Sequence, residues 1–143
     1  MTRLFTLFLA ITLLLTFTSC EQSEPPETGR VGDKVFFSGY EWNVKSSEQI
    51  QGPGPNFFSN AESDIYVDES GYVHLHITKR GDTWYSTELV SEENMGYGTY
   101  SFTVEGDFVN MPENIVVGLF TWDNDTFFEQ ANSEVDVELS KWG

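Results

Sequence analysis

The stretch SEVDVEL, from Ser133 to Leu139, alternates acidic and apolar residues with a period of two. In an extended strand, successive side chains point to opposite faces, so the three carboxylates share one face and the three aliphatic side chains share the other. The carboxylates belong to Glu134, Asp136 and Glu138, and the aliphatic side chains belong to Val135, Val137 and Leu139. This alternation predicts a β-strand with an acidic front and an apolar back that is buried between two sheets.

Three carboxylates at neighbouring positions on one face repel one another, so a purely structural strand would gain from Thr or Lys in the middle. Chemistry that needs both a carboxylic acid and a carboxylate uses such a set. A rise of about 3.3 Å per residue separates the Cα atoms of Glu134 and Glu138 by about 13 Å. Side chains that lean together approach the ~5–5.5 Å carboxyl spacing of a retaining glycosidase, and the ~6.5–9.5 Å spacing of an inverting one stays open. The alternative is an accidental alternation in an acidic chain.

Acidic residues dominate the charge of the chain. The 23 Asp and Glu against seven Lys and Arg give a formal net charge of −16 at pH 7. Nucleic-acid binding depends on basic side chains that neutralise phosphates, so we expect no nucleic-acid partner. An acidic surface is also common in exported proteins, where it favours solubility, and so it identifies no partner by itself.

The first twenty residues have the composition of an export signal. An apolar run from Leu4 to Phe17 follows Arg3 and is too short for a membrane-spanning helix of about 20 residues. Cys20, the single cysteine, follows small residues in an arrangement that resembles a bacterial lipobox. We therefore expect residues 1–20 to be a lipoprotein signal peptide and Cys20 to be lipidated, which anchors the exported chain to a bacterial membrane, on its periplasmic side or at the cell surface. An ordinary signal peptide and an uncleaved anchor are the alternatives.

The rest of the chain divides into a short linker and a β-rich region. Residues 21–32 read EQSEPPETGRVG, a composition typical of a flexible tether. From residue 33 to residue 143 the apolar periodicity is that of strands, and no segment has a helical face. Strands are predicted over residues 35–44, 65–67, 72–78, 84–91, 99–105, 115–122 and 133–139. Many short strands separated by turn signals, with 15% aromatic residues, predict one all-β domain built as a two-sheet sandwich.

Three segments together resemble glycoside hydrolase family 16. They are GYGTYSF at residues 96–102, IVVGLFTW at residues 115–122 and EVDVE at residues 134–138. The family includes lichenases, laminarinases, agarases and carrageenases, built on a concanavalin A-like β-jelly roll. The resemblance covers nearly all of residues 33–143 and implies an all-β jelly-roll sandwich. Family members continue well beyond the acidic motif, so we expect this chain to be the N-terminal part of such a domain, with an incomplete jelly roll.

The resemblance also implies roles for the carboxylates. Glu134 corresponds to the nucleophile and Glu138 to the acid/base, while Asp136 between them holds a charge or a hydrogen bond against both. The implied activity is retaining hydrolysis of a β-linked polysaccharide, a β-1,3/1,4-glucan or a related galactan. The alternative is a non-catalytic carbohydrate-binding lipoprotein with the same jelly roll.

Four further residues are candidates for binding the polysaccharide. Sugar rings stack on aromatic side chains, which favours Trp122 and, more weakly, Trp142, although Trp122 also suits a core position. Glu88 falls where lichenases carry a sugar-binding Glu in a Glu-x-Arg-Ser segment, but here the segment reads ELVS and lacks the Arg. Asn56 lies in the Gly- and Pro-rich loop of residues 52–57, which predicts either a cleft wall or an ordinary turn.

We expect no required cofactor and no catalytic metal. His74 and His76 lie on one strand face without a third ligand nearby in the sequence, which favours a surface strand over a zinc site. The Asp-rich turn at residues 123–125 is the one candidate for a structural Ca²⁺, with a solvated loop as the alternative.

Overall fold

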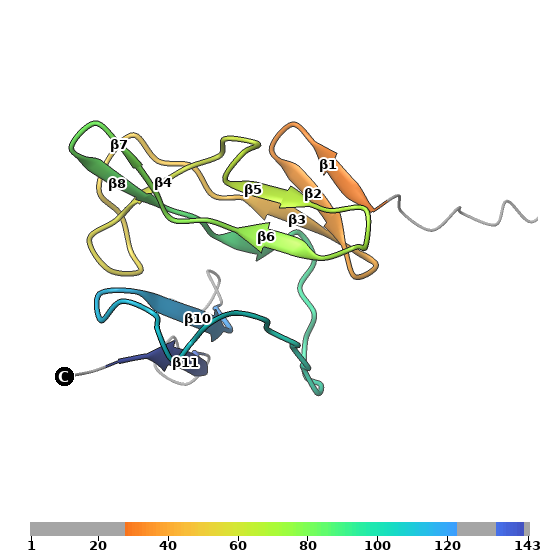
Figure 1. Cartoon of the computed structure of the whole chain (residues 1–143). Helices are drawn as coiled ribbons and strands as arrows, with labels where there is room; N and C mark the ends of the chain where they lie inside the picture. The colour runs from red at the N-terminus through yellow and green to blue at the C-terminus, as the bar shows by residue number, and fades with distance from the viewer. Residues whose placement is uncertain (1–27, 123–133, 142–143) are drawn as a thin grey trace, which may run out of the picture. The chain divides into compact units, whose positions relative to one another are not determined.

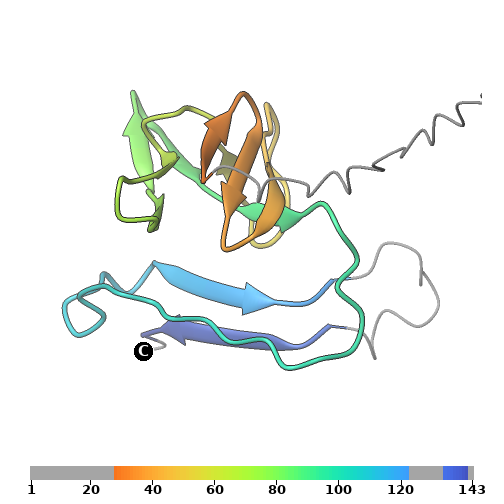
Figure 2. The same ribbon diagram turned by 90° about the vertical axis from the view of Figure 1, so that its right-hand side faces the viewer.

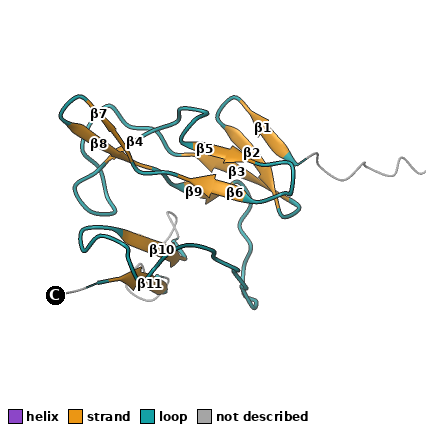
Figure 3. Cartoon of the chain, viewed as in Figure 1, coloured by secondary structure: helices purple, strands orange, loops and turns teal. Residues whose placement is uncertain are grey.

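The computed structural model describes residues 28–122 and 134–141, which form eleven β-strands and no helix (Figures 1 and 3). The all-β class predicted from the sequence is confirmed. We expected one domain from Asp33 onward, whereas the chain groups into two compact units: Met1–Gly96, the N-terminal unit, and Tyr97–Gly143, the C-terminal unit. Within the described ranges, no helix is long and apolar enough to cross a membrane.

A four-stranded antiparallel sheet begins the N-terminal unit, with the strand order β1-β2-β3-β9 (Figure 1). Its strands are β1 (Gly29–Val31), β2 (Lys34–Phe37), β3 (Tyr40–Val44) and β9 (Leu89–Ser91). The strand predicted over residues 35–44 is thus two strands. Ser38 and Gly39 separate them, both at positive φ (56° and 82°), which is the backbone of a two-residue type I′ hairpin turn.

Strand β1 lies inside the segment that the sequence assigned to a flexible tether. Its residues pair with β2 from Gly29↔Phe36 to Val31↔Lys34. The Arg30 guanidinium fixes the strand further, because Nη1 donates to the carbonyl oxygen of Ile65 at 2.7 Å. The ordered part of the chain therefore starts at least four residues before Asp33.

Two smaller sheets complete the N-terminal unit. Strands β5 (Ile65–Val67) and β6 (Val73–Leu75) form an antiparallel pair. The order β4-β8-β7 joins β4 (Phe57–Phe58), β8 (Thr83–Ser86) and β7 (Thr78–Arg80), with β4 parallel to β8. The strands predicted over residues 72–78 and 84–91 are each divided between two sheets. Their apolar periodicity indicates strand structure correctly, but each range contains a break between two strands.

A small apolar core holds the N-terminal unit together. Val35 and Ile65 are fully buried, and Val44 is 7% exposed. The partly buried side chains packed against them are those of Phe37, Trp42, Val67, Val73 and Leu89. Full burial of an aliphatic side chain contributes about 1.5–3 kcal/mol, so this cluster is the main source of the unit's stability.

The C-terminal unit contains one antiparallel pair, β10 (Val116–Phe120) and β11 (Asp136–Ser140), which lie side by side in Figure 2. Strand β10 confirms the middle of the strand predicted over residues 115–122, and β11 confirms the C-terminal part of the one predicted over residues 133–139 and extends one residue beyond it. The strand predicted over residues 99–105 is instead a loop (Figure 3).

The predicted burial of the apolar back of β11 is wrong for two of its three residues. Val135 and Val137 are 65% and 56% exposed, and Leu139 is half-buried. No described residue of the C-terminal unit is fully buried. Burial on both sides requires a second layer of structure, and a pair of strands does not supply one by itself.

Candidate active site

The register of β10 and β11 determines which side chains share a face. Residues directly opposite each other in an antiparallel pair point to the same side of the sheet. Gly118 lies opposite Glu138, and Phe120 lies opposite Asp136. The other face carries aliphatic pairs, including Leu119 opposite Val137. The acidic residues of β11 therefore lie beside an aromatic ring and a glycine of β10.

The same alternation extends the acidic face beyond the last ladder pair. The Thr121 backbone N–H donates to the carbonyl oxygen of Val135 at 3.0 Å, and the Val135 N–H donates to Thr121 Oγ1, also at 3.0 Å. These two bonds join the residues next to Trp122 and Glu134, and strand alternation places Trp122 and Glu134 on the acidic face. We call Gly118, Phe120, Trp122, Glu134, Asp136 and Glu138 the carboxylate face.

The carboxylate face is open to solvent. Glu134, Asp136 and Glu138 are exposed, and Phe120 and Trp122 are 38% and 51% exposed. A Cβ atom placed on Gly118 would have only a Phe120 ring carbon within 4 Å, at 3.8 Å, so the missing side chain leaves room next to Glu138. The arrangement offers ionisable oxygens beside aromatic surface, which suits a polyhydroxylated ring with apolar C–H faces.

Sequence reasoning missed Phe120 and Gly118. Both residues precede Trp122 at intervals of two, so the predicted strand over residues 115–122 already placed all three on one face. Which face of β11 they join depends on the register, and the register is a property of the folded pair.

Glu88 lies in the N-terminal unit and is held by a cation. Its carboxylate accepts a hydrogen bond from Lys45 Nζ at 2.8 Å, and the two side chains are 12% and 21% exposed. The Lys45 ammonium also lies 4.3 Å from the ring centroid of Phe58. The segment after Glu88 lacks the Arg of lichenases, and Lys45 supplies a positive charge to this carboxylate from the end of β3.

Asn56 has a structural partner in its own turn. Its Nδ2 donates to the carbonyl oxygen of Pro53 at 2.9 Å, and its backbone pairs with that of Gln51. Gly54 has a φ of 66°, and a Cβ atom there would approach Asn56 Nδ2 to 2.9 Å. The side chain therefore stabilises the loop, and its contact with a sugar hydroxyl stays a prediction.

His74 belongs to a small polar group around the turn after β5. Its Nε2 lies 2.8 Å from Asp68 Oδ2, and its ring stacks on that of Tyr66 at 4.6 Å. The hydrogen bond from His74, with those from the backbone of Tyr72 and Ser70, lowers the pKa of Asp68. In residues 28–122 and 134–141, no three His, Cys, Asp or Glu side chains are grouped to hold a metal ion.

Three predicted features lie outside the described residues. They are the lipidation candidate Cys20, the aromatic candidate Trp142 and the Asp-rich turn at residues 123–125. The structure therefore brings together Trp122 with the three carboxylates in the C-terminal unit, and Glu88 with Lys45 in the N-terminal unit.

Comparisons with known proteins supply no further assignment. No protein-family model, no curated protein and no solved structure matches the chain significantly. The roles of the β11 carboxylates therefore depend on their pattern, their register and their neighbours.

Proposed function

We propose that this chain belongs to an exported, lipid-anchored glycoside hydrolase, similar to family 16 and built on a jelly roll. Its substrate is a β-linked polysaccharide, a β-1,3/1,4-glucan or a related galactan, which it cleaves with retention of configuration. The observation that carries the proposal is the carboxylate face, where three exposed carboxylates lie beside Phe120 and Trp122. The all-β architecture is compatible with this fold class.

In the first step, the Glu134 carboxylate attacks the anomeric carbon and forms a glycosyl ester. The bond from that carbon to the leaving oxygen breaks, and the Glu138 carboxylic acid donates its proton to the leaving oxygen. In the second step, Glu138 takes a proton from a water molecule. The resulting hydroxide attacks the anomeric carbon and releases Glu134 as a carboxylate.

The neighbours of Glu134 and Glu138 support different roles for the two residues, as nucleophile and as acid/base. Asp136 lies between them on the same face, where it holds a charge or a hydrogen bond against both. Phe120 lies opposite Asp136 and offers an apolar surface to a sugar ring, and Trp122 extends that surface toward Glu134. The space beside Gly118 admits the leaving group next to Glu138. The proposed reaction requires no cofactor.

The proposal is tested by the release of reducing sugar from a panel of β-glucans and galactans. The wild-type chain should hydrolyse at least one of them, and Glu134→Ala should lower the rate by about 10³-fold or more, because no nucleophile remains. Glu113→Ala, a change at an exposed Glu of the same unit, is the matched control and should retain full activity. Polysaccharide binding without any released sugar would instead establish a non-catalytic binding protein.

The proposed anchor has a separate test. Cells that express the chain are grown with a radioactive fatty acid. The wild-type protein should become labelled and Cys20→Ala should not, since lipidation requires the thiol. Equal labelling of both proteins would contradict lipidation at Cys20 and leave the proposal for the carboxylate face unaffected.

A further inference from the structure

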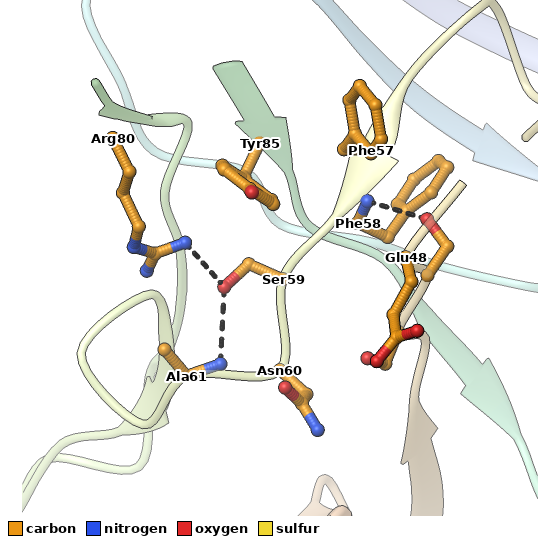
Figure 4. Close-up of a pocket in the computed structure, with 10 residues that line it drawn as sticks. Glu48, Phe57, Phe58, Ser59, Asn60, Ala61, Arg80 and Tyr85 are labelled. Atoms are coloured by element: carbon orange, nitrogen blue, oxygen red, sulfur yellow. Dashed lines mark hydrogen bonds between the residues drawn. The ribbon is translucent and has the colours of Figure 1, made fainter. Parts of the chain in front are cut away.

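An open pocket of about 460 Å³ in the N-terminal unit is lined by residues of β4, β7 and β8 and of the loops at residues 46–48 and 59–61. Its volume is within the ~300–1,000 Å³ range of ligand sites. Figure 4 shows Arg80 and Tyr85 on one side of Ser59, and Glu48 on the other. Phe57 completes an aromatic wall, with its ring centroid 5.8 Å from that of Tyr85. We call this the Arg80 pocket, and it contains no residue of the carboxylate face.

Arg80 is held in a fixed orientation at the pocket. Its Nη1 donates to the hydroxyl oxygen of Ser59 at 3.0 Å, and its Nη2 donates to Asp64 Oδ2. Its guanidinium lies 5.0 Å from the ring centroid of Tyr85. These two hydrogen bonds use two of the five N–H groups of the guanidinium, and the side chain is still 39% exposed. Arg80 therefore presents oriented donors to the pocket.

The groups that hold Arg80 are themselves buried. Ser59 and Asp64 are 5% and 2% exposed. Ser59 also accepts a hydrogen bond from the Ala61 backbone N–H at 3.2 Å, and Asp64 accepts one from Thr78 Oγ1 at 2.9 Å. A donor fixed by buried partners loses little side-chain entropy when it binds a ligand, which is the basis of a preorganised site.

The charges of the pocket disfavour an anionic ligand. The positive charge of Arg80 is already paired with Asp64, and the exposed Glu48 carboxylate adds a negative charge to the lining. A neutral ring that bears several hydroxyl groups suits the charged donor, the carboxylate acceptor and the aromatic wall of the pocket. Its hydroxyls donate to Glu48 and accept from Arg80, and its C–H face lies against Phe57 or Tyr85. We propose that the Arg80 pocket binds a neutral saccharide unit, as a glycan-binding site that shares no residue with the carboxylate face.

The test is a nuclear magnetic resonance titration of the full chain with laminarihexaose, cellohexaose and neoagarohexaose. It is carried out on Glu134→Ala, so that hydrolysis at the proposed active site does not consume the probe. At least one hexasaccharide should shift, with saturation, the Arg80 Nε–H signal together with the backbone amide signals of Ser59, Asn60 and Ala61. The same three probes at equal concentration without such shifts would overturn the proposal.

Variants assign the binding to the pocket. Glu48→Ala should lower the affinity for the hexasaccharide about tenfold, because it removes one charged acceptor of hydrogen bonds from the sugar hydroxyls. Glu69→Ala, at another exposed Glu of the same unit, is the matched control and should leave the affinity unchanged. Arg80→Lys should also weaken binding, since an ammonium lacks the planar set of donors. Wild-type affinity in both pocket variants, or tighter binding of trigalacturonate than of the neutral probes, would contradict the proposal.

The outcome is independent of the proposed hydrolysis. A chain that releases no sugar from any polysaccharide would still show the titration at Arg80 if the pocket binds saccharides. A chain that hydrolyses polysaccharide without shifts at Arg80, Ser59 and Asn60 would keep its enzymatic function and lose this second site.

Discussion

The two units of the chain use the same kind of strand in different ways. The N-terminal unit packs the buried side chains of Val35, Val44 and Ile65 between its four-stranded sheet and the β5–β6 pair. The C-terminal unit presents both faces of β10 and β11 at least partly to solvent, and none of its described residues is fully buried. The N-terminal unit is therefore held mainly by apolar burial, whereas the described residues of the C-terminal unit are held by the hydrogen-bond ladder of β10 and β11.

This difference separates the residues that stabilise the chain from those that carry its proposed chemistry. The carboxylate face stays accessible, since Glu134, Asp136 and Glu138 are exposed among the described residues of their unit. The N-terminal unit instead holds a buried carboxylate, Asp64, in an ion pair with the partly exposed Arg80. Substitutions in the two units should thus separate effects on stability from effects on activity.

The largest effect on stability is expected at the centre of the N-terminal core. Ile65→Ala should lower the free energy of unfolding by about 2–5 kcal/mol, because it removes a fully buried side chain and leaves a cavity. Urea denaturation followed by near-ultraviolet circular dichroism measures the loss. A change below about 0.5 kcal/mol would show that Ile65 is not part of a packed core.

A smaller loss is expected from the ion pair of Asp64 with Arg80. Asp64→Asn should cost about 1–3 kcal/mol, since it leaves Arg80 without its charged partner, and the 39% exposure of Arg80 limits the cost through solvent screening. Asp82→Asn, in the exposed turn between β7 and β8, is the matched control and should change the stability by less than about 0.5 kcal/mol. Equal stability of the two variants would contradict the role of the pair.

Asp64 should also make the stability depend on pH. Burial alone would raise its pKa, but hydrogen bonds from Ser59, Arg80 and Thr78 and the charge of Arg80 lower it below the ordinary value of 3.8. The folded state therefore releases this proton more readily than the unfolded state. The resulting stabilisation is present above the ordinary pKa and is lost as the pH falls through the folded value.

The unfolding free energy of the wild type should consequently decrease more between about pH 5 and pH 2 than that of Asp64→Asn. Asp68 and Glu92, whose pKa values are also lowered, are present in both proteins and contribute equally to each curve. Parallel curves for the two proteins would show that Asp64 has the same pKa in the folded and unfolded states.

The smallest effect is expected on the apolar face of the C-terminal unit. Val137→Thr should change the unfolding free energy by less than about 0.5 kcal/mol, because the side chain is 56% exposed and both residues favour strands. A loss of about 2 kcal/mol or more would show that this face is packed in solution, and it would remove the contrast between the two units.

Local patterns indicated several strands, but they missed β1 and β4, predicted a strand at the loop of residues 99–105 and ran across three breaks between strands. The alternation of Ser133–Leu139 indicated β11, and the apolar run of residues 115–122 indicated β10. The turn at Ser38 and Gly39 was missed, since a single sequence does not show that both residues take positive φ. Arg80 lies between the strands predicted over residues 72–78 and 84–91, whereas in the structure it ends β7 and pairs with Asp64, sixteen residues earlier.

In the candidate site, too, the sequence predicts the residues of one strand but not their neighbours on another strand. The sequence identified the three carboxylates and Trp122, because they follow the period of a strand. It did not identify Phe120 as the neighbour of Asp136, since that contact depends on the register of two strands far apart in the chain. The burial expected for Val135 and Val137 failed for a related reason, because a periodic pattern gives the direction of a side chain and not what covers it.

The most direct test of the carboxylate face is chemical rescue of Glu134→Ala with azide, on an oligosaccharide substrate with an activated leaving group. The small anion occupies the space left by the carboxylate and attacks the anomeric carbon from the same side, so the expected product is a glycosyl azide of α configuration from a β-linked substrate. Glu138→Ala should instead retain activity on this substrate, which needs little protonation, and should give no α-azide. An unimpaired Glu134→Ala, or a rescued product of β configuration, would contradict the assignment of Glu134 as the nucleophile.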